Sequence, residues 1–250
     1  MLNIRKLISP NFNDRAGGVQ PSILVLHYTG TDTGQEAEDY YMNTKIHAKA
    51  GLISPHYMID RDGTITQFVD EQKRAWHAGQ SWWDGKSDIN SHSIGIELVN
   101  PGHCRQYLSF TGEQMTALAE LTRDILSRHD IPAHNIIGHS DISPATDRQK
   151  PDPGEKLDWE WLAAQGIGVF PAPEKDDFAM ADVLYDDLAS LRQALNEYGY
   201  DPRVTDDEAI SAFQRHFQAD AHHSKAAGIP DRDTGARLHW LLSRKNAFKA

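Results

Sequence analysis

Strand-like and helix-like segments are unevenly distributed along this chain of 250 residues. Short runs rich in β-branched and other apolar residues all lie in its first 140 positions, at 22–27, 55–59, 64–68, 93–98 and 135–138. Beyond residue 180 the apolar residues follow helical periodicity instead. This division limits the chain to an α/β first part followed by a small helical second part.

A hairpin and a long helix are the clearest elements of the first part. Asp62-Gly63 lies between the second and third strand-like runs, and glycine accepts the positive φ of a tight primed turn. Thr111 and Gln114 have the spacing of a capping box, and apolar residues then recur at helical periodicity until Pro132. Antiparallel pairing within a strand–helix alternation predicts a mixed central β-sheet flanked by helices.

A boundary lies at 170–177, where two prolines and a run of charges interrupt both periodicities. We expect a first domain at 1–170, a linker at 171–180 and a second, three-helix domain at 181–250. The apolar stripes that predict its helices are Leu184, Leu188, Leu191 and Leu195; Ile210, Phe213 and Phe217, preceded by the capping pair Thr205 and Glu208; and Leu238, Leu241 and Leu242.

Composition excludes some classes of protein. Acidic residues outnumber basic ones by 36 to 25, and a net charge of −11 opposes the counterion release that drives binding to nucleic acids. Cys104 is the only cysteine, which excludes an internal disulfide and leaves the redox compartment undetermined.

The N-terminus and the hydropathy pattern bear on location. Residues 1–10 carry two basic side chains, Arg5 and Lys6, but residues 11–15 are mostly polar where a signal peptide needs an apolar segment. No apolar run approaches the roughly 20 residues that span a bilayer. We expect a monomer without a transmembrane segment, located in the cytoplasm, with the periplasm or cell envelope as the alternative if a leader has been removed.

Three side chains have the chemistry of a catalytic metal site. His27 ends the first strand-like run, His139 follows the last one, and Asp152 lies between two prolines. Two imidazoles and one carboxylate leave a fourth tetrahedral position open for the water that catalytic zinc activates. Each residue taken alone also fits a core histidine or an ordinary turn, so the combination carries the prediction of a metal-dependent hydrolase.

Four motifs resemble, in order, the zinc N-acetylmuramoyl-L-alanine amidases of the type 2 amidase and peptidoglycan-recognition-protein superfamily. They are His27-Tyr28-Thr29, Ile94-Gly95-Ile96-Glu97, Gly138-His139-Ser140-Asp141-Ile142 and Lys150-Pro151-Asp152-Pro153-Gly154. The resemblance covers about 21–161. It implies an amidase-like fold, one zinc ion, and hydrolysis of the amide between N-acetylmuramic (or 1,6-anhydro-N-acetylmuramic) acid and L-alanine of peptidoglycan or muropeptides.

The resemblance also implies roles for individual residues. His27, His139 and Asp152 match the zinc ligands. Glu97 matches the carboxylate that orients or deprotonates the attacking water, and Lys150 matches the cation that stabilises the oxyanion. These residue types suit the chemistry, because amide hydrolysis needs a base near the water and positive charge near the carbonyl oxygen. Without the resemblance, Glu97 also fits a strand-end salt bridge and Lys150 a solvated loop cation.

Three further residues are candidates for contact with the substrate. Trp76 offers an aromatic face to a sugar, and Asn90 offers an amide to the stem peptide. His77 is assigned to the substrate groove or to support of a zinc ligand, since three other side chains already fill the protein side of a tetrahedral site. His56 is expected to be structural, and ordinary packing is the alternative for Trp76.

The C-terminal part resembles the peptidoglycan-binding domain 1 family, which implies peptidoglycan as a partner. A three-helix packing module without a ligand is the alternative, and two rival functions for the whole chain are a non-catalytic muropeptide-binding protein and a wall-anchoring protein. The residues that carry this resemblance are Leu191-Arg192-Gln193-Ala194-Leu195, Tyr198-Gly199-Tyr200, Ala212-Phe213-Gln214-Arg215-His216-Phe217 and Asp231-Arg232-Asp233-Thr234-Gly235-Ala236-Arg237-Leu238.

Overall fold

The computed structural model describes residues 2–45, 51–145, 150–184 and 187–249. The chain divides into two compact units, Met1–Gln80 with Asp88–Ile131 and Ser81–Ser87 with Pro132–Ala250. Within the described ranges, no helix has the length and apolar character needed to cross a membrane. The predicted division into a first domain at 1–170, a linker at 171–180 and a second domain at 181–250 stays a prediction.

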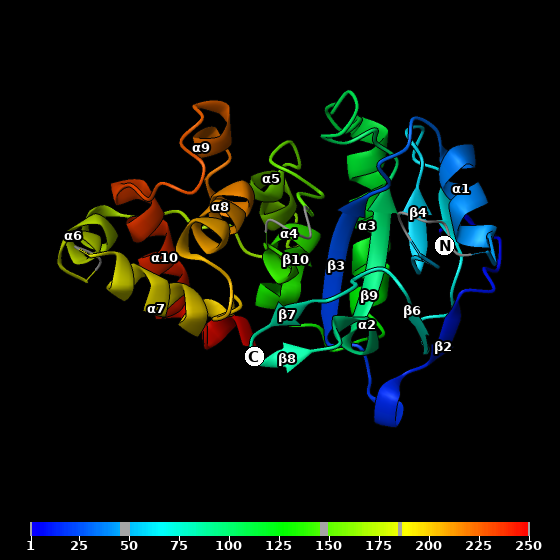
Figure 1. Cartoon of the computed structure of the whole chain (residues 1–250), viewed down its shortest axis with the longest axis horizontal. Coiled ribbons are helices and arrows are strands. Elements are labelled where there is room, and N and C mark those ends of the chain that lie inside the picture. The colour runs from blue at the N-terminus through cyan, green and yellow to red at the C-terminus, as the bar shows by residue number, and fades with distance from the viewer. Residues whose placement is uncertain (1, 46–50, 146–149, 185–186, 250) are drawn as a thin grey trace. The chain divides into compact units, whose positions relative to one another are not determined.

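Five strands of the first unit belong to one mixed sheet (Figure 1), in the order β1 (Ile4–Lys6), β5 (Ile65–Gln67), β4 (Tyr57–Ile59), β9 (Ser93–Leu98) and β3 (Ile23–Tyr28). Its β4–β5 pair is antiparallel, whereas β1–β5, β4–β9 and β3–β9 are parallel. The apolar residues of β3 are fully buried, as expected for a parallel strand covered on both faces. The predicted mixed sheet is therefore confirmed.

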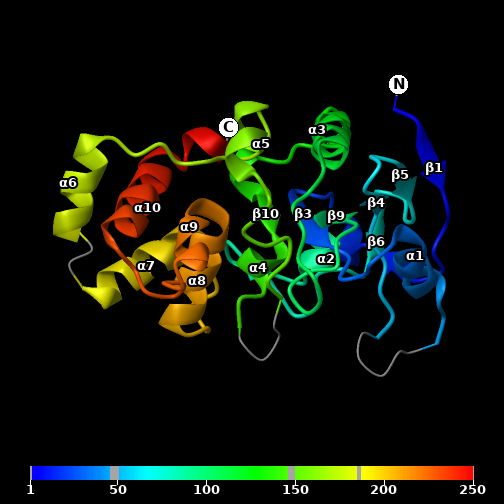
Figure 2. The same cartoon turned by 90° about the horizontal axis from the view of Figure 1, so that it is seen from above.

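Helices cover both faces of this sheet, and Figure 2 shows α3 (Gly112–Leu126) and α1 (Gly34–Met42) on opposite sides of it. Ala37 and Tyr41 of α1 pack in one buried cluster with Met58 of β4. The apolar face of α3 is buried through Leu118 and Leu121, among others. The remaining elements of the unit are the antiparallel pair β2 (Phe12–Asp14) and β6 (Lys73–Ala75), the short helix α2 (Ile89–His92) and a 3-10 turn at Ala16–Gly18.

The predicted hairpin and capping box are both present, with two corrections. Gly63 takes a positive φ of 84°, but the loop runs over residues 60–64 and closes through Asp60 N–H to Thr64 O, so a two-residue primed turn is wrong. The N–H of Gln114 donates to Thr111 Oγ1 at 3.0 Å, and the N–H of Thr111 donates to Gln114 Oε1 at 3.2 Å. The helix ends at Leu126, earlier than Pro132 suggested.

The second unit is mainly helical (Figure 1). Buried Leu195, Phe213 and Leu238 mark the helices predicted after residue 180. The stripe that begins at Leu184 was predicted as one helix, but it falls on two: α6 (Lys175–Leu184) ends there, and α7 (Leu188–Tyr198) follows. The elements are β7 (Trp82–Trp83), β8 (Lys86–Ser87), β10 (Ile136–Gly138), α4 (His139–Ile142), α5 (Trp159–Ala164), α6 (Lys175–Leu184), α7 (Leu188–Tyr198), α8 (Asp206–Phe217), α9 (Asp220–His223), α10 (Arg232–Arg244) and 3-10 turns at Ala133–Asn135 and Ala247–Lys249.

Candidate active site

His27 and Glu97 are direct neighbours on the two longest strands of the first unit. The register of the parallel pair β3–β9 places the Cα of His27 opposite that of Glu97. Adjacent strands lie about 4.8 Å apart, and paired residues project to the same face of a sheet. His27 is buried and Glu97 is half-buried. The sheet therefore presents an imidazole and a carboxylate side by side near the carboxyl ends of both strands.

His77 contacts His27 directly. The two rings meet edge to face, and His27 Nε2 lies 3.0 Å from His77 Nδ1. On its other side, His77 Nε2 lies 3.2 Å from Ser93 Oγ. His77 thus lies between His27 and Ser93, and both roles predicted for His77 stay predictions.

Asn90 and Trp76 have structural partners in the first unit. The Oδ1 atom of Asn90 accepts the backbone N–H groups of His77 and Ala78 at 2.9 and 2.8 Å. The indole N–H of Trp76, which is half-buried, donates to Asn13 Oδ1 at 2.7 Å. The predicted substrate contacts of both side chains stay predictions, while the carbonyl of Asn90 has a clear role in holding the backbone at residues 77 and 78.

His139 and Asp152 lie together in the second unit. His139 begins α4 directly after β10, and its Nδ1 lies 3.0 Å from Asp152 Oδ2. Ser140 N–H donates to Asp152 O at 2.9 Å, which ties the two segments together. A Cβ on Gly138 would lie 2.7 Å from Pro153 Cδ, so glycine permits this close approach. Lys150 is exposed two residues before Asp152.

The donor pair fits a zinc ion. Both side chains are buried, and imidazole and carboxylate are ordinary zinc ligands. Bond lengths of about 2.0 Å in a tetrahedral site place two donor atoms about 3.3 Å apart. The observed distance of 3.0 Å between His139 Nδ1 and Asp152 Oδ2 is close to this separation of two donor atoms.

The helix that begins with His139 is held by His216 of α8 and by Tyr200, which follows the end of α7. Asp141 is fully buried and accepts the hydroxyl of Tyr200 at 2.7 Å and Nδ1 of His216 at 2.8 Å. It also accepts the N–H of Gly138 at 2.8 Å. Neither Asp141 nor His216 was predicted to have a role at the site. The sequence does not reveal that these two polar side chains are buried, although each lies in a motif that carries a family resemblance.

Two tryptophans of the second unit help to pack it. Trp83 is buried, donates its indole N–H to Asn135 Oδ1, and meets Tyr198 and Tyr200 edge to face. Trp82 lies beneath the Arg203 guanidinium at 4.8 Å. The hairpin β7–β8 is thereby joined to residues near the end of α7.

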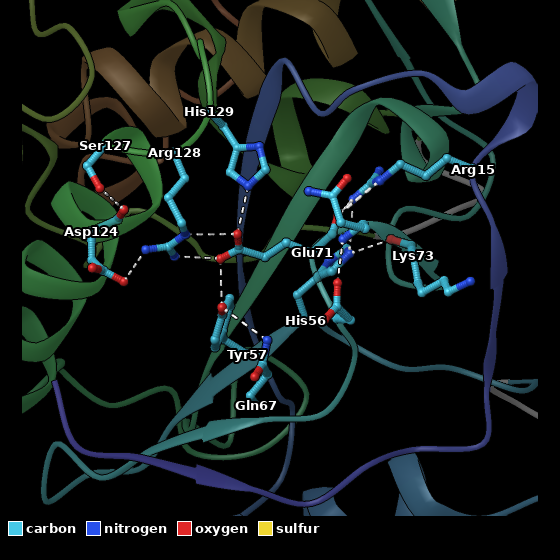
Figure 3. Close-up of polar contacts among 12 residues, drawn as sticks. Arg15, His56, Tyr57, Gln67, Glu71, Lys73, Asp124, Ser127, Arg128 and His129 are labelled. Atoms are coloured by element: carbon cyan, nitrogen blue, oxygen red, sulfur yellow. Dashed lines mark hydrogen bonds and ion pairs between the residues drawn. The ribbon is translucent and has the colours of Figure 1, made fainter. Parts of the chain in front are cut away.

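A buried carboxylate organises a polar cluster in the first unit (Figure 3). Glu71 accepts hydrogen bonds from Tyr57 Oη at 2.6 Å, from the Arg128 guanidinium and from His129 Nε2 at 2.7 Å. Burial alone would raise the pKa of the Glu71 carboxyl, but the hydrogen bonds from Arg128, Tyr57 and His129 outweigh it and lower this pKa to about 2. The cluster connects the segment after β5 to the end of α3.

His56 is structural, as predicted. It is fully buried, and its Nδ1 accepts the N–H of Gly95 at 3.0 Å while its Nε2 lies 3.0 Å from Lys73 O. Burial, aided by the positive charge of Arg15, lowers the pKa of His56 to about 3. The ring is therefore neutral at neutral pH and supports β9 rather than titrating.

The chain is similar to known amidases along most of its length. It is 35% identical over 243 residues to the N-acetylmuramoyl-L-alanine amidase AmiD of Escherichia coli, covering 89% of this chain and 82% of the relative. It is 37% identical over 173 residues to the 1,6-anhydro-N-acetylmuramyl-L-alanine amidase AmpD of Haemophilus influenzae, covering 64% of this chain and 90% of AmpD.

Solved structures agree with the sequence relatives. The E. coli AmiD structure, in complex with the substrate anhydro-N-acetylmuramic acid-L-Ala-D-gamma-Glu-L-Lys, has a TM-score of 0.76 and 32% identity, covering 93% of this chain and 92% of that one. The structure of AmpDh3 from Pseudomonas aeruginosa with anhydromuramic pentapeptide has a TM-score of 0.75 and 30% identity, covering 92% and 94%. A family model described as N-acetylmuramoyl-L-alanine amidase matches residues 17–155. This chain therefore belongs to the N-acetylmuramoyl-L-alanine amidase family, whose members hydrolyse an amide bond.

Proposed function

We propose that this protein uses one zinc ion to hydrolyse the amide between the lactyl group of muramic acid and L-alanine of a muropeptide. Zinc is typical of the family, and His27, His139 and Asp152 are the candidate metal-ligand set among the described residues. The observation that carries the proposal is the buried pair of His139 and Asp152, whose donor atoms are 3.0 Å apart.

Bound zinc would supply Lewis acidity toward a water molecule and toward the scissile carbonyl oxygen. We assign Glu97 as the base whose carboxylate takes a proton from the attacking water. We assign Lys150 as the cation whose ammonium group stabilises negative charge on the carbonyl oxygen. Glu97 then returns its proton to the departing amine of L-alanine.

Soluble anhydromuropeptides are the proposed substrates. Structures of AmiD and AmpDh3 contain anhydromuramyl peptides, and this chain covers more than nine-tenths of each. For the C-terminal part, 181–250, we keep the proposal that it binds peptidoglycan. A sedimentation assay with purified sacculi tests that second role separately from catalysis.

The main experiment uses the full-length protein and a defined anhydromuramyl tripeptide, with mass measurement of the released peptide. Chelation should abolish release and added zinc should restore it. Asp152→Ala should lower the rate at least 100-fold and remove bound zinc, whereas Asp176→Ala, which removes an exposed carboxylate of the same unit, should change neither. Full activity after complete zinc removal would disprove the metal mechanism. Tight muropeptide binding with no hydrolysis by the wild type would favour the non-catalytic binder instead.

A further inference from the structure

A chain of hydrogen bonds leads from a backbone carbonyl to His27 in the first unit. The hydroxyl of Ser93 lies 2.7 Å from Ile89 O and 3.2 Å from His77 Nε2. A carbonyl oxygen can only accept, and a serine hydroxyl has one proton. Ser93 therefore donates to Ile89 O, and its oxygen is left to accept the proton of His77 Nε2.

The same accounting determines both histidine tautomers. A neutral imidazole carries one N–H and one lone pair. With its proton on Nε2, His77 has a lone pair on Nδ1, which lies 3.0 Å from His27 Nε2. His27 must then donate from Nε2, so its own lone pair is on Nδ1. Because a metal binds the unprotonated nitrogen, Nδ1 is the atom that His27 offers to zinc.

The position of the His77 ring is tightly specified. A Cβ on Gly95 would lie 2.6 Å from both Cγ and Nδ1 of His77, so only glycine lets the ring lie against β9. The ring of His56 packs edge to face against the ring of His77, and the two ring centroids are 5.6 Å apart. Asn90 holds the backbone N–H of His77. These contacts give the ring little freedom to turn and exchange its two nitrogens.

We propose that His77 is a positioning residue that, together with Ser93, holds His27 as the Nε2–H tautomer and thereby presents Nδ1 to the metal. The inference rests on the proposed function, because it assumes that His27 is a zinc ligand. It adds a reason for the glycine at position 95 and for the serine at position 93. Partners that orient a ligating histidine in this way typically change metal affinity by about 10- to 100-fold when removed.

Two variants at position 77 test the role of the acceptor atom. In His77→Leu no acceptor remains for His27 Nε2–H, and zinc affinity should fall about 10- to 100-fold in a competition assay with a chelating dye. In His77→Gln the amide oxygen can accept the same proton, and affinity should stay within about threefold of wild type. His223→Leu, a change at an exposed histidine, should have no effect. Equal affinity of His77→Leu and wild type would overturn the proposal.

Nitrogen NMR of the zinc-free protein supplies a readout that does not depend on activity. With 15N-labelled histidine, wild-type His27 should carry its proton on Nε2, and Ser93→Ala should produce a mixture of tautomers at His27 and His77. Ser93→Ala is the smaller change, so it still tests the proposal if His77→Leu fails to fold. Detection of His27 protonated on Nδ1 in the wild type would refute the inference. A wild type that binds no zinc at all would instead refute the proposed function, while the tautomer result would still stand.

Discussion

Glu71 should make the free energy of unfolding of this protein depend on pH. The substitution Glu71→Gln should remove that part of the pH dependence. Its carboxylate is buried and accepts hydrogen bonds from Tyr57, Arg128 and His129 (Figure 3). These bonds lower its pKa from 4.5 to about 2. A group whose pKa is depressed by folding stabilises the native state above its unfolded pKa, and this contribution is lost as pH falls through the folded pKa.

The magnitude follows from the shift. A difference of about 2.5 pKa units corresponds to roughly 3 kcal/mol, at 1.36 kcal/mol per unit. This amount should be fully present above about pH 4.5 and should fall to under half by about pH 3. Glu71→Gln removes the titrating group and leaves the Arg128 guanidinium without its buried carboxylate, so we expect a loss of about 3 kcal/mol at pH 7.

Urea unfolding of the wild type and of Glu71→Gln, between pH 7 and pH 3, measures the contribution of Glu71 to the free energy of unfolding. The difference between their free energies of unfolding should shrink as the pH falls, because only the wild type loses the contribution of Glu71. Glu120→Gln, which changes an exposed carboxylate of α3 outside the cluster, should change the free energy of unfolding by less than about 0.5 kcal/mol at every pH. A difference that is constant from pH 7 to pH 3, or smaller than about 1 kcal/mol at pH 7, would show that the hydrogen bonds do not stabilise the ionised form.

Three further substitutions test the packing of the site and of the fold. Gly95→Ala should force the His77 ring away from β9, lower the free energy of unfolding by about 1–3 kcal/mol and weaken zinc binding. Wild-type values in both thermal unfolding and a zinc titration would contradict the close approach of this ring to Gly95. Tyr200→Phe removes a donor to buried Asp141 and should cost about 2 kcal/mol in urea unfolding, and an unchanged midpoint would argue against this hydrogen bond. Thr111→Ala should cost about 1 kcal/mol by loss of the N-cap, as read from thermal unfolding.

Local patterns in the sequence predicted the elements that local physics determines. The capping pair Thr111 and Gln114 correctly marked the start of α3, because both hydrogen bonds join residues three apart. The end of α3 was less predictable. It ends at Leu126, before the proline, and His129 beyond it donates to Glu71, 58 residues earlier in the chain. A contact between residues so far apart in the chain leaves no periodic pattern in the sequence.

The short strands illustrate the same limit. β3 and β9 were predicted because continuous apolar runs indicate strands buried on both faces. β1, with Ile4 followed by Arg5 and Lys6, was missed, because two of its three residues are charged and its strand character depends on pairing with β5. Edge strands of this kind depend on a neighbour for their definition more than on their own composition.

The sequence by itself determined the chemistry available to this protein: a histidine and a glutamate at strand ends, a histidine and an aspartate in motifs bounded by glycine and proline, and the resemblance that these motifs carry. Only the tertiary structure decided which polar atoms meet. The row of polar contacts along Ile89, Ser93, His77 and His27, and the hydrogen bonds from Tyr200 and His216 to buried Asp141, depend on register and packing between distant segments. The physical reason is that a hydrogen bond requires two groups within about 3 Å, and residue identity alone contains no distance.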